Sequence, residues 1–294
     1  FLIHAAHQTI SLAPRITELF AAGWALTRPF NCLITAISVG VGALTSSGLA
    51  ASPQVVAAAA SAALIAAAGN VYNDLRDLEI DRINRPNRPL PSGRISTRAT
   101  AIEAAALGLA GWLLSFWLGP YLWAISTGVV AGLYLYSSHL KSTVLWGNLL
   151  VSGLAAAAFP YGALAAGGMG RTWLPASFAF LFHFSREIIK DMEDVVGDRR
   201  RGVSTLALVA GPRRAAAMAV SSSAILMVVT LVPWVMGIYG LAYLVAIGVM
   251  DALLVLVAFR VIRSGGRLTD QRLSRILTVG MLLGLLAIVL GESL

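Results

Sequence analysis

The sequence is poor in charged residues and nearly devoid of cysteine. Only 12% of its 294 residues are charged, about half of the roughly 25% that is typical of a soluble globular protein. The single cysteine, Cys32, lies in an apolar run, which excludes a disulfide framework and a CxxC metal site. We expect it to be a small buried residue. The histidines lack metal-ligand spacing; they are His4, His7, His139 and His183.

Apolar residues are abundant instead. They make up 57% of the chain, and the mean hydropathy is +0.78. A transmembrane helix needs about 20 mostly apolar residues, and the sequence predicts an all-α bundle of about nine such spans, forming a single domain over residues 1–294. The predicted spans are 30–50, 54–75, 99–118, 121–138, 145–167, 173–192, 214–237, 239–261 and 272–291. The first 14 residues lack the basic region and apolar core of a signal peptide.

The basic residues support this division. All but one of the 22 lysines and arginines fall at one side of the predicted spans, and only Arg171 falls at the other. Cytoplasmic segments of membrane proteins collect basic residues, so we expect the N terminus to be cytoplasmic and the C terminus to lie outside, in a multi-pass protein of the cell membrane. The pI of about 10.2 then reflects orientation in the bilayer and an anionic substrate, and no nucleic acid partner is indicated.

Carboxylates gather in two short windows, residues 70–81 and 187–198, which hold nine of the 14. Each window ends a predicted span and repeats the spacing i, i+4, i+7, i+11. The first set is Asn70, Asp74, Asp77 and Asp81, and the second is Glu187, Asp191, Asp194 and Asp198. On a continuous helix at about 100° per residue, each set shares one narrow face.

Like charges stacked on one helical face repel each other, so two such faces need a cation between them. Carboxylate and amide oxygens suit Mg²⁺, which keeps positions open for water and substrate phosphates. The sequence therefore predicts a magnesium diphosphate site in a central chamber that opens near the cytoplasmic side, with Arg76, Arg186 and Lys190 contacting further phosphate oxygens. The alternative is a pair of solvated, salt-bridged helix ends, which two clusters of matching spacing disfavour.

The sequence resembles the UbiA superfamily of intramembrane prenyltransferases. The matching motifs are NDLRDLEID (73–81), DMEDVVGD (191–198), Arg28-Pro-Phe-Asn31, Tyr136-Ser, Leu140-Lys141 and Gly147-Asn148. Within that superfamily, residues 84–96 (NRPNRPLPSGRIS) and 186–194 (REIIKDMED) most resemble the archaeal digeranylgeranylglyceryl phosphate synthases. That family transfers the prenyl group of geranylgeranyl diphosphate to geranylgeranylglyceryl phosphate, which forms the second ether bond of archaeal lipids.

The resemblance implies a role for each matching residue. Mg²⁺ and the diphosphate would be held by Asn73, Asp77, Asp81, Asp191, Asp194 and Asp198. Arg28 and Lys141 would contact phosphate oxygens, Asn31 and Asn148 would contact substrate, and Tyr136 would lie near the reacting carbon. Asp77 and Asp191 would act in catalysis through the metal, and Asp74 is a candidate acceptor for the proton of the acceptor hydroxyl. Late proton loss to pyrophosphate would serve equally.

An allylic cation formed in a dry chamber is stabilised by aromatic faces. The candidates are Tyr134, Tyr136, Phe159, Tyr161, Phe182 and Phe184, for which ordinary packing is the alternative. A phosphate-bearing acceptor also needs cations of its own, and the loop with Arg82, Arg85, Arg88 and Arg94 is well placed to supply them. These arginines would otherwise serve only topology and anionic lipid headgroups.

Two other functions remain open. Another member of the superfamily would prenylate an aromatic acid, such as 4-hydroxybenzoate or a naphthoate. A cation-coupled transporter would also carry acids within its spans, but near the middle of the bilayer and on interrupted helices. Asp251, inside the eighth span, either marks a polar pocket or is hydrogen-bonded to a neighbouring helix. Residues 166–170 are expected to form an external loop.

Overall fold

The computed structural model describes residues 17–48, 52–268 and 272–293, and these residues form helices and connecting turns without any β-strand. His4, His7, Arg15 and the end of the first predicted span at residues 49–50 lie outside the described residues. Residues 17–27 are helical and lead into the first long helix. The predicted all-helical fold is therefore confirmed for the described part of the chain.

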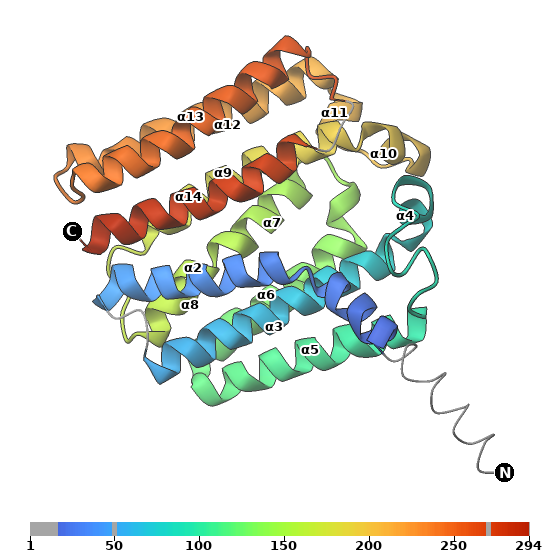
Figure 1. Cartoon of the computed structure of the whole chain (residues 1–294), viewed down its shortest axis with the longest axis horizontal. Helices are drawn as coiled ribbons and strands as arrows, with labels where there is room; N and C mark the ends of the chain where they lie inside the picture. Colours follow the sequence, from blue (N-terminus) through green and yellow to red (C-terminus); the bar gives the residue numbers. More distant parts are fainter. Residues whose placement is uncertain (1–16, 49–51, 269–271, 294) are drawn as a thin grey trace.

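The helices run roughly side by side in one bundle (Figure 1). After the helical residues 17–27 they are α2 (Pro29–Ser47), α3 (Pro53–Arg76), α4 (Leu78–Asn84), α5 (Thr97–Leu118), α6 (Pro120–Ser138), the 3₁₀ turn η1 (Leu140–Ser142), α7 (Trp146–Ala156), α8 (Ala158–Ala165), α9 (Trp173–Glu193), α10 (Val195–Arg201), α11 (Leu206–Val209), α12 (Pro212–Val235), α13 (Leu241–Arg263) and α14 (Leu273–Ser293). Four of them begin with proline, which lacks the N–H that the first helical turn leaves unpaired.

Seven stretches of the described chain are long and apolar enough to cross a membrane, namely α2, α3, α5, α7 with α8, α12, α13 and α14. The protein is thus a multi-pass membrane protein. The other two predicted spans are also helices, α6 and α9. Helix α6 carries three tyrosines, and α9 carries five charged residues between Arg186 and Glu193, which makes both less apolar than the seven. The fifth predicted span is divided at Ala157 into α7 and α8.

Helices α2 and α8 meet backbone to backbone through a pair of glycines. A Cβ atom on Gly42 would lie 2.0 Å from the carbonyl oxygen of Phe159, and one on Gly162 would lie 1.8 Å from that of Val39. Small residues allow such close approach of membrane helices. This contact fixes α2, and with it the chain at Arg28, against the middle of the bundle.

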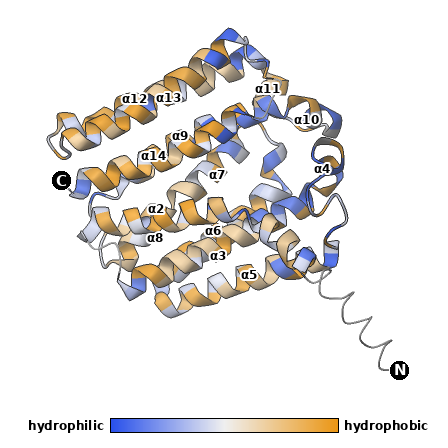
Figure 2. Cartoon of the chain, viewed as in Figure 1, coloured by the Kyte–Doolittle hydropathy of each residue, from blue (hydrophilic) through white to orange (hydrophobic). Residues whose placement is uncertain are grey.

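Polar residues concentrate at one end of the bundle. Figure 2 shows hydrophilic colour on α4, α10 and the adjoining helix ends, whereas the long helices are mostly hydrophobic. Helices α4 and α10 lie against each other there. At the opposite end Arg171 forms an ion pair with Glu292 (2.9 Å), which also accepts a hydrogen bond from the hydroxyl of Tyr239 (2.8 Å). The two acidic segments therefore share one end of the molecule.

Candidate active site

Both acidic segments contain the same break in the helix. Helix α3 ends at Arg76 and α4 begins at Leu78, with Asp77 between them at φ −92° and ψ 0°. Helix α9 ends at Glu193 and α10 begins at Val195, with Asp194 between them at φ −94° and ψ 3°. The prediction of a continuous helix through each window is therefore wrong. Like charges on neighbouring turns repel each other, but Asp74 and Asp81 stay close enough across the break for one nitrogen of Arg88 to contact both.

The break occurs at equivalent positions of the two motifs. The amide of Asp77 donates to the carbonyl of Asn73, and that of Asp194 donates to the carbonyl of Lys190, both at 2.9 Å. The carbonyls of Asp77 and Asp194 then accept from Asp81 (2.8 Å) and Asp198 (3.0 Å). Each middle aspartate thus ends one helix and starts the next. The matching spacing in the sequence corresponds to matching backbone geometry.

The two breaks face a cavity of about 300 Å³, which we call the polar cavity. All six residues predicted to hold metal and diphosphate line it: Asn73, Asp77, Asp81, Asp191, Asp194 and Asp198. Six predicted or neighbouring cationic side chains line it as well: Arg28, Arg76, Arg85, Arg88, Lys141 and Lys190. Two acidic motifs about a hundred residues apart in sequence therefore converge on a single site.

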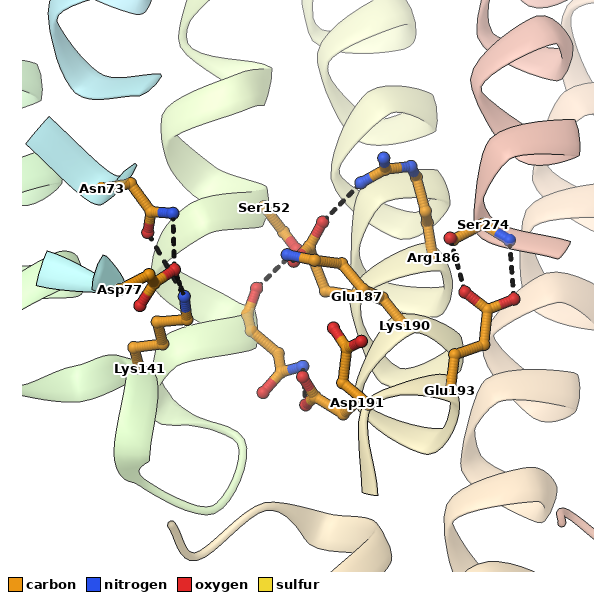
Figure 3. A network of polar contacts seen from close by, with 12 residues as sticks. Asn73, Asp77, Lys141, Ser152, Arg186, Glu187, Lys190, Asp191, Glu193 and Ser274 are labelled. Atoms are coloured by element: carbon orange, nitrogen blue, oxygen red, sulfur yellow. Dashed lines mark hydrogen bonds and ion pairs between the residues drawn. The ribbon is translucent and has the colours of Figure 1, made fainter. Parts of the chain in front are cut away.

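On one wall of the polar cavity, Asp77 is held by two partners. The ammonium group of Lys141, from η1, forms an ion pair with its carboxylate and lies 3.4 Å from Asn73 Oδ1. The side-chain amide of Asn73 donates to Asp77 Oδ2 at 2.8 Å. Figure 3 shows these three residues together, across the site from the polar residues of α9.

Arginines neutralise the other two aspartates of the first motif. Arg88 Nη1 lies 2.6 Å from Asp81 Oδ2 and 3.3 Å from Asp74 Oδ1. Arg28 is the second partner of Asp74, and it adopts the left-handed conformation (φ 52°) immediately before Pro29, which is unfavourable for a residue with a side chain. Burial raises the pKa of the Asp81 carboxyl, and the charge of Arg88 opposes that shift. Asp74 is buried in these ion pairs and lines neither this cavity nor the chamber described below.

The second motif is tied to the first and to α7. Asn148 Nδ2 donates to Asp191 Oδ2 at 2.8 Å, which explains why Asn148 is buried against α9 rather than exposed in the cavity. Arg85, which follows α4, lies 3.4 Å from Asp194, which precedes α10. This ion pair bridges the two acidic segments at the polar end.

These donors fit Mg²⁺ that arrives with a diphosphate. Within the described ranges, no three histidine, cysteine, aspartate or glutamate side chains form a ready-made metal cluster. Asp77, Asp81 and Asp194 are instead paired with lysine or arginine. Mg²⁺ commonly takes only one or two carboxylates, with waters and substrate phosphates completing its shell. Asp77 and Asp81 on one wall, and Asp194 and Asp198 on the other, supply such oxygens around a cavity lined by cations that suit phosphate.

A second cavity of about 290 Å³ extends into the bundle, and we call it the central chamber. Five residues line both cavities and so mark their junction: Arg28, Asn73, Tyr136, Ser137 and Lys190. The rest of the chamber is mostly apolar, with alanine, isoleucine, valine and leucine side chains from α3, α6 and α7. A smaller pocket of about 60 Å³ continues from it between α9, α12, α13 and α14. The arrangement joins a charged mouth to an apolar interior.

The six aromatic residues predicted to stabilise an allylic cation lie in different places in the structure. Tyr136 lies at the junction, and Tyr161 lines the chamber. Phe159 and Phe182 line the smaller pocket. Tyr134 is exposed and stacks on Tyr72 at 5.5 Å, and Phe184 stacks on Phe180 at 6.3 Å. Neither Tyr134 nor Phe184 lines any of these three cavities.

The predicted arginine loop reaches the polar cavity only in part. Arg85 and Arg88 line it, whereas Arg82 pairs with Glu79 at 2.8 Å on the surface. Arg94 donates to its own loop, to the carbonyl of Asn87 at 2.6 Å and to Ser92 Oγ at 3.0 Å. The two outer arginines thus stabilise the local structure rather than the cavity.

Other predicted residues lie deeper. Asn31 and Arg186 line the central chamber and not the polar cavity. Asp251 accepts a hydrogen bond from Thr230 of the neighbouring α12 at 3.3 Å. This contact agrees with the second expectation for Asp251, a hydrogen bond to a neighbouring helix. Cys32 is half-buried and donates to the carbonyl of Thr27 at 3.1 Å.

Thr205 was missed by the sequence analysis. It lines the polar cavity, and its buried Oγ1 has no partner among the described residues. It belongs to no motif and carries no charge, so only the fold brings it to the site.

Comparison with known proteins decides the family. The model of the UbiA prenyltransferase family matches residues 32–290. The chain belongs to this family. It is a prenyltransferase, as the resemblance of its motifs implied. Digeranylgeranylglyceryl phosphate synthase of Thermococcus kodakarensis is 35% identical over 93% of this chain and 98% of that protein. The protein of the same name from Methanopyrus kandleri is 37% identical over 89% and 96%.

Solved structures of UbiA proteins have the same fold. A structure described as that of a digeranylgeranylglyceryl phosphate synthase in membranes is 29% identical, with a TM-score of 0.74 over 94% of this chain and 99% of that chain. A UbiA homologue from Archaeoglobus fulgidus bound to GPP and Mg²⁺ is 22% identical, with a TM-score of 0.72 over 92% and 98%. The predicted fold family is therefore confirmed.

Proposed function

We propose that this UbiA prenyltransferase transfers a geranylgeranyl group from geranylgeranyl diphosphate to the free hydroxyl of geranylgeranylglyceryl phosphate, forming the second ether bond of an archaeal membrane lipid. The observation that carries the proposal is the convergence of two acidic helix breaks, at Asp77 and Asp194, on one cation-lined cavity that opens into an apolar chamber. The names of the relatives support the choice of acceptor.

In this proposal the polar cavity binds the diphosphate and Mg²⁺. The oxygens of the six residues from Asn73 to Asp198 named above would hold the metal, with the phosphates as further ligands. Four cationic residues would pair with phosphate oxygens in place of the carboxylates that they now contact, namely Arg28, Arg85, Arg88 and Lys141. Arg76, which also lines the cavity, would add a further phosphate contact. When bound, Mg²⁺ neutralises charge that develops on the departing pyrophosphate.

The central chamber would hold the prenyl chain and exclude water. The allylic carbon then lies near the junction of the two cavities, where the face of Tyr136 stabilises positive charge on it. The C–O bond to the diphosphate breaks, and the acceptor oxygen forms the new ether bond. Because Asp74 is engaged by Arg28 and Arg88, the hydroxyl proton passes to the departing pyrophosphate in this scheme.

The orientation in the membrane follows from the basic residues. We infer that α6 and α9 cross the bilayer with the seven more apolar stretches, giving nine crossings in a single domain. The polar cavity then opens at the cytoplasmic side, beside α4 and α10, and the C terminus lies outside. A site at this depth lets a water-soluble diphosphate head and a lipid chain bind together.

The other two functions are less well supported. An aromatic acid would fit the same family, but the relatives named above are synthases of a glyceryl phosphate lipid. A transporter would need its acids near the middle of the bilayer, whereas Asp77 and Asp194 lie at the ends of α3 and α9.

The experiment is a transfer assay with the purified protein in lipid nanodiscs. Radiolabelled geranylgeranyl diphosphate is incubated with geranylgeranylglyceryl phosphate or with 4-hydroxybenzoate, with Mg²⁺ or with EDTA, and products are separated by thin-layer chromatography. We expect a labelled diether with the first acceptor only, dependent on Mg²⁺ and abolished by Asp194→Asn. Product from the aromatic acid alone would refute the proposed acceptor.

A further inference from the structure

A charged cluster on α9, at the start of the second acidic window, lines the central chamber. Arg186 Nη1 lies 2.6 Å from Glu187 Oε1, and Lys190 Nζ lies 3.2 Å from the other carboxylate oxygen. Arg186 Nη2 also contacts Thr278 Oγ1 of α14 at 3.4 Å. In Figure 3 Glu187 lies between the two cations, which makes the three residues one unit.

This cluster carries more positive than negative charge. Arg186 and Lys190 share one carboxylate, that of Glu187. Among the described residues, the other arginine, lysine, aspartate or glutamate that lines the chamber is Arg28, which pairs with Asp74. The remaining chamber walls are neutral and mostly apolar. Arg186 Nε is buried and has no partner among the described residues. An excess cation with an unused donor in such surroundings is costly unless an anion joins it.

The diphosphate of the donor is poorly placed to be that anion. Lys190 lines both cavities, but Arg186 lines only the central chamber. Along α9, Arg186 lies about 12 Å from Asp194 at a rise of 1.5 Å per residue. A diphosphate bound between the two acidic helix breaks therefore lies well away from the free donor of Arg186.

We propose that Arg186, with Thr278 and Lys190, forms a second anion subsite that binds the phosphate of the acceptor. This inference rests on the proposed function, in which the acceptor carries both a prenyl chain and a phosphate. The glycerol carbon bearing the free hydroxyl is next to the carbon bearing the phosphate. A phosphate held at Arg186 thus leaves the hydroxyl between this subsite and the junction at Tyr136, where the allylic carbon lies.

The chemistry of arginine suits this ligand. Its planar group offers several donors in a fixed geometry that matches two phosphate oxygens, and Glu187 uses only one edge of it. Glu187 also holds Arg186 and Lys190 near each other, so that a phosphate between them would offset the one excess positive charge of the cluster and accept from the unused Nε of Arg186. The subsite therefore selects a phosphate-bearing acceptor over a neutral one.

The test compares Arg186→Gln with the unchanged protein on two acceptors, geranylgeranylglyceryl phosphate and geranylgeranylglycerol, which lacks the phosphate. Loss of a charged contact should raise the KM for the phosphorylated acceptor about 10- to 100-fold. The KM for the donor, and the low activity on geranylgeranylglycerol, should change by less than about twofold. Arg186→Lys should recover part of the loss. Arg214→Gln, on the exposed first turn of α12, is the matched control and should behave as the unchanged protein.

Binding of a thio-analogue of geranylgeranyl diphosphate with Mg²⁺ reports on the fold of each variant and should be unchanged in Arg186→Gln. An unchanged acceptor KM, a larger effect on the donor KM, equal loss on both acceptors, or lost binding of the analogue would each overturn the assignment of Arg186 to the acceptor phosphate. Failure of the unchanged protein to use geranylgeranylglyceryl phosphate, with transfer to an aromatic acid, would instead refute the proposed function.

Discussion

Arg88 offers a direct test of how the carboxylates are neutralised before substrate binds. Its guanidinium lies 2.6 Å from Asp81 and 3.3 Å from Asp74, and its side chain is 24% exposed against 6% for each aspartate. Breaking a buried ion pair costs about 3–5 kcal/mol. Because Arg88 keeps some contact with solvent and Asp74 retains Arg28, we expect Arg88→Met to lower the free energy of unfolding by about 2–3 kcal/mol.

The matched control is Arg82→Met, six residues earlier in the chain. Arg82 pairs with Glu79 at 2.8 Å, but their side chains are 56% and 81% exposed, and a surface pair of this kind contributes at most about 1 kcal/mol. Equilibrium unfolding in mixed micelles with increasing SDS measures both variants. Equal losses of stability in the two would refute the idea that Asp81 depends on a buried partner.

Three further changes test other parts of the account. Asp198→Asn should raise the Mg²⁺ concentration for half-maximal product formation about tenfold or more, since a charged contact is worth about 1.5–3 kcal/mol; an unchanged Mg²⁺ titration would remove Asp198 from the metal site. Tyr136→Phe should keep kcat near that of the unchanged enzyme, because the aromatic ring remains. Tyr136→Leu should lower kcat by roughly 2- to 30-fold through loss of about 0.5–2 kcal/mol of cation–π stabilisation. Equal kcat values for the two variants would refute the role of the ring. Gly42→Ala should destabilise the fold by about 1–3 kcal/mol, because its Cβ would lie 2.0 Å from a backbone oxygen. Gly40→Ala on the same helix is the control in SDS unfolding, since a Cβ there meets no atom within 4 Å; equal losses would refute the close contact of α2 with α8.

The chemistry of the site could be predicted from the sequence to a large extent. The spacing of two acidic windows, each at the end of an apolar run, predicted a shared site, and the resemblance supplied the six candidate ligands, all of which line one cavity. Three residues of the spacing pattern do not line that cavity, namely Asn70, Asp74 and Glu187. The spacing could not reveal the helix breaks at Asp77 and Asp194, because regular helical periodicity assumes an unbroken axis. The matching breaks depend on backbone turns that residue types alone do not specify.

The partners of the charged residues depend on the fold. Arg88 contacts Asp74 and Asp81 from within its own loop, but Arg28 and Lys141 reach Asp74 and Asp77 from distant segments. Spacing along one helix carries no information about such contacts. The same holds for Arg186, which the sequence groups with the second acidic motif but which the structure places in the central chamber.

In the proposed mechanism, a divalent ion and a diphosphate bind together between the two acidic helix breaks. Crystals grown with Mn²⁺ in place of Mg²⁺ and a thio-analogue of geranylgeranyl diphosphate would locate the metal by its anomalous signal. We expect that signal between Asp77 and Asp81 on one wall and Asp194 and Asp198 on the other, with the diphosphate bound to it. A diphosphate bound elsewhere in the bundle, with no metal signal between these aspartates, would contradict the account.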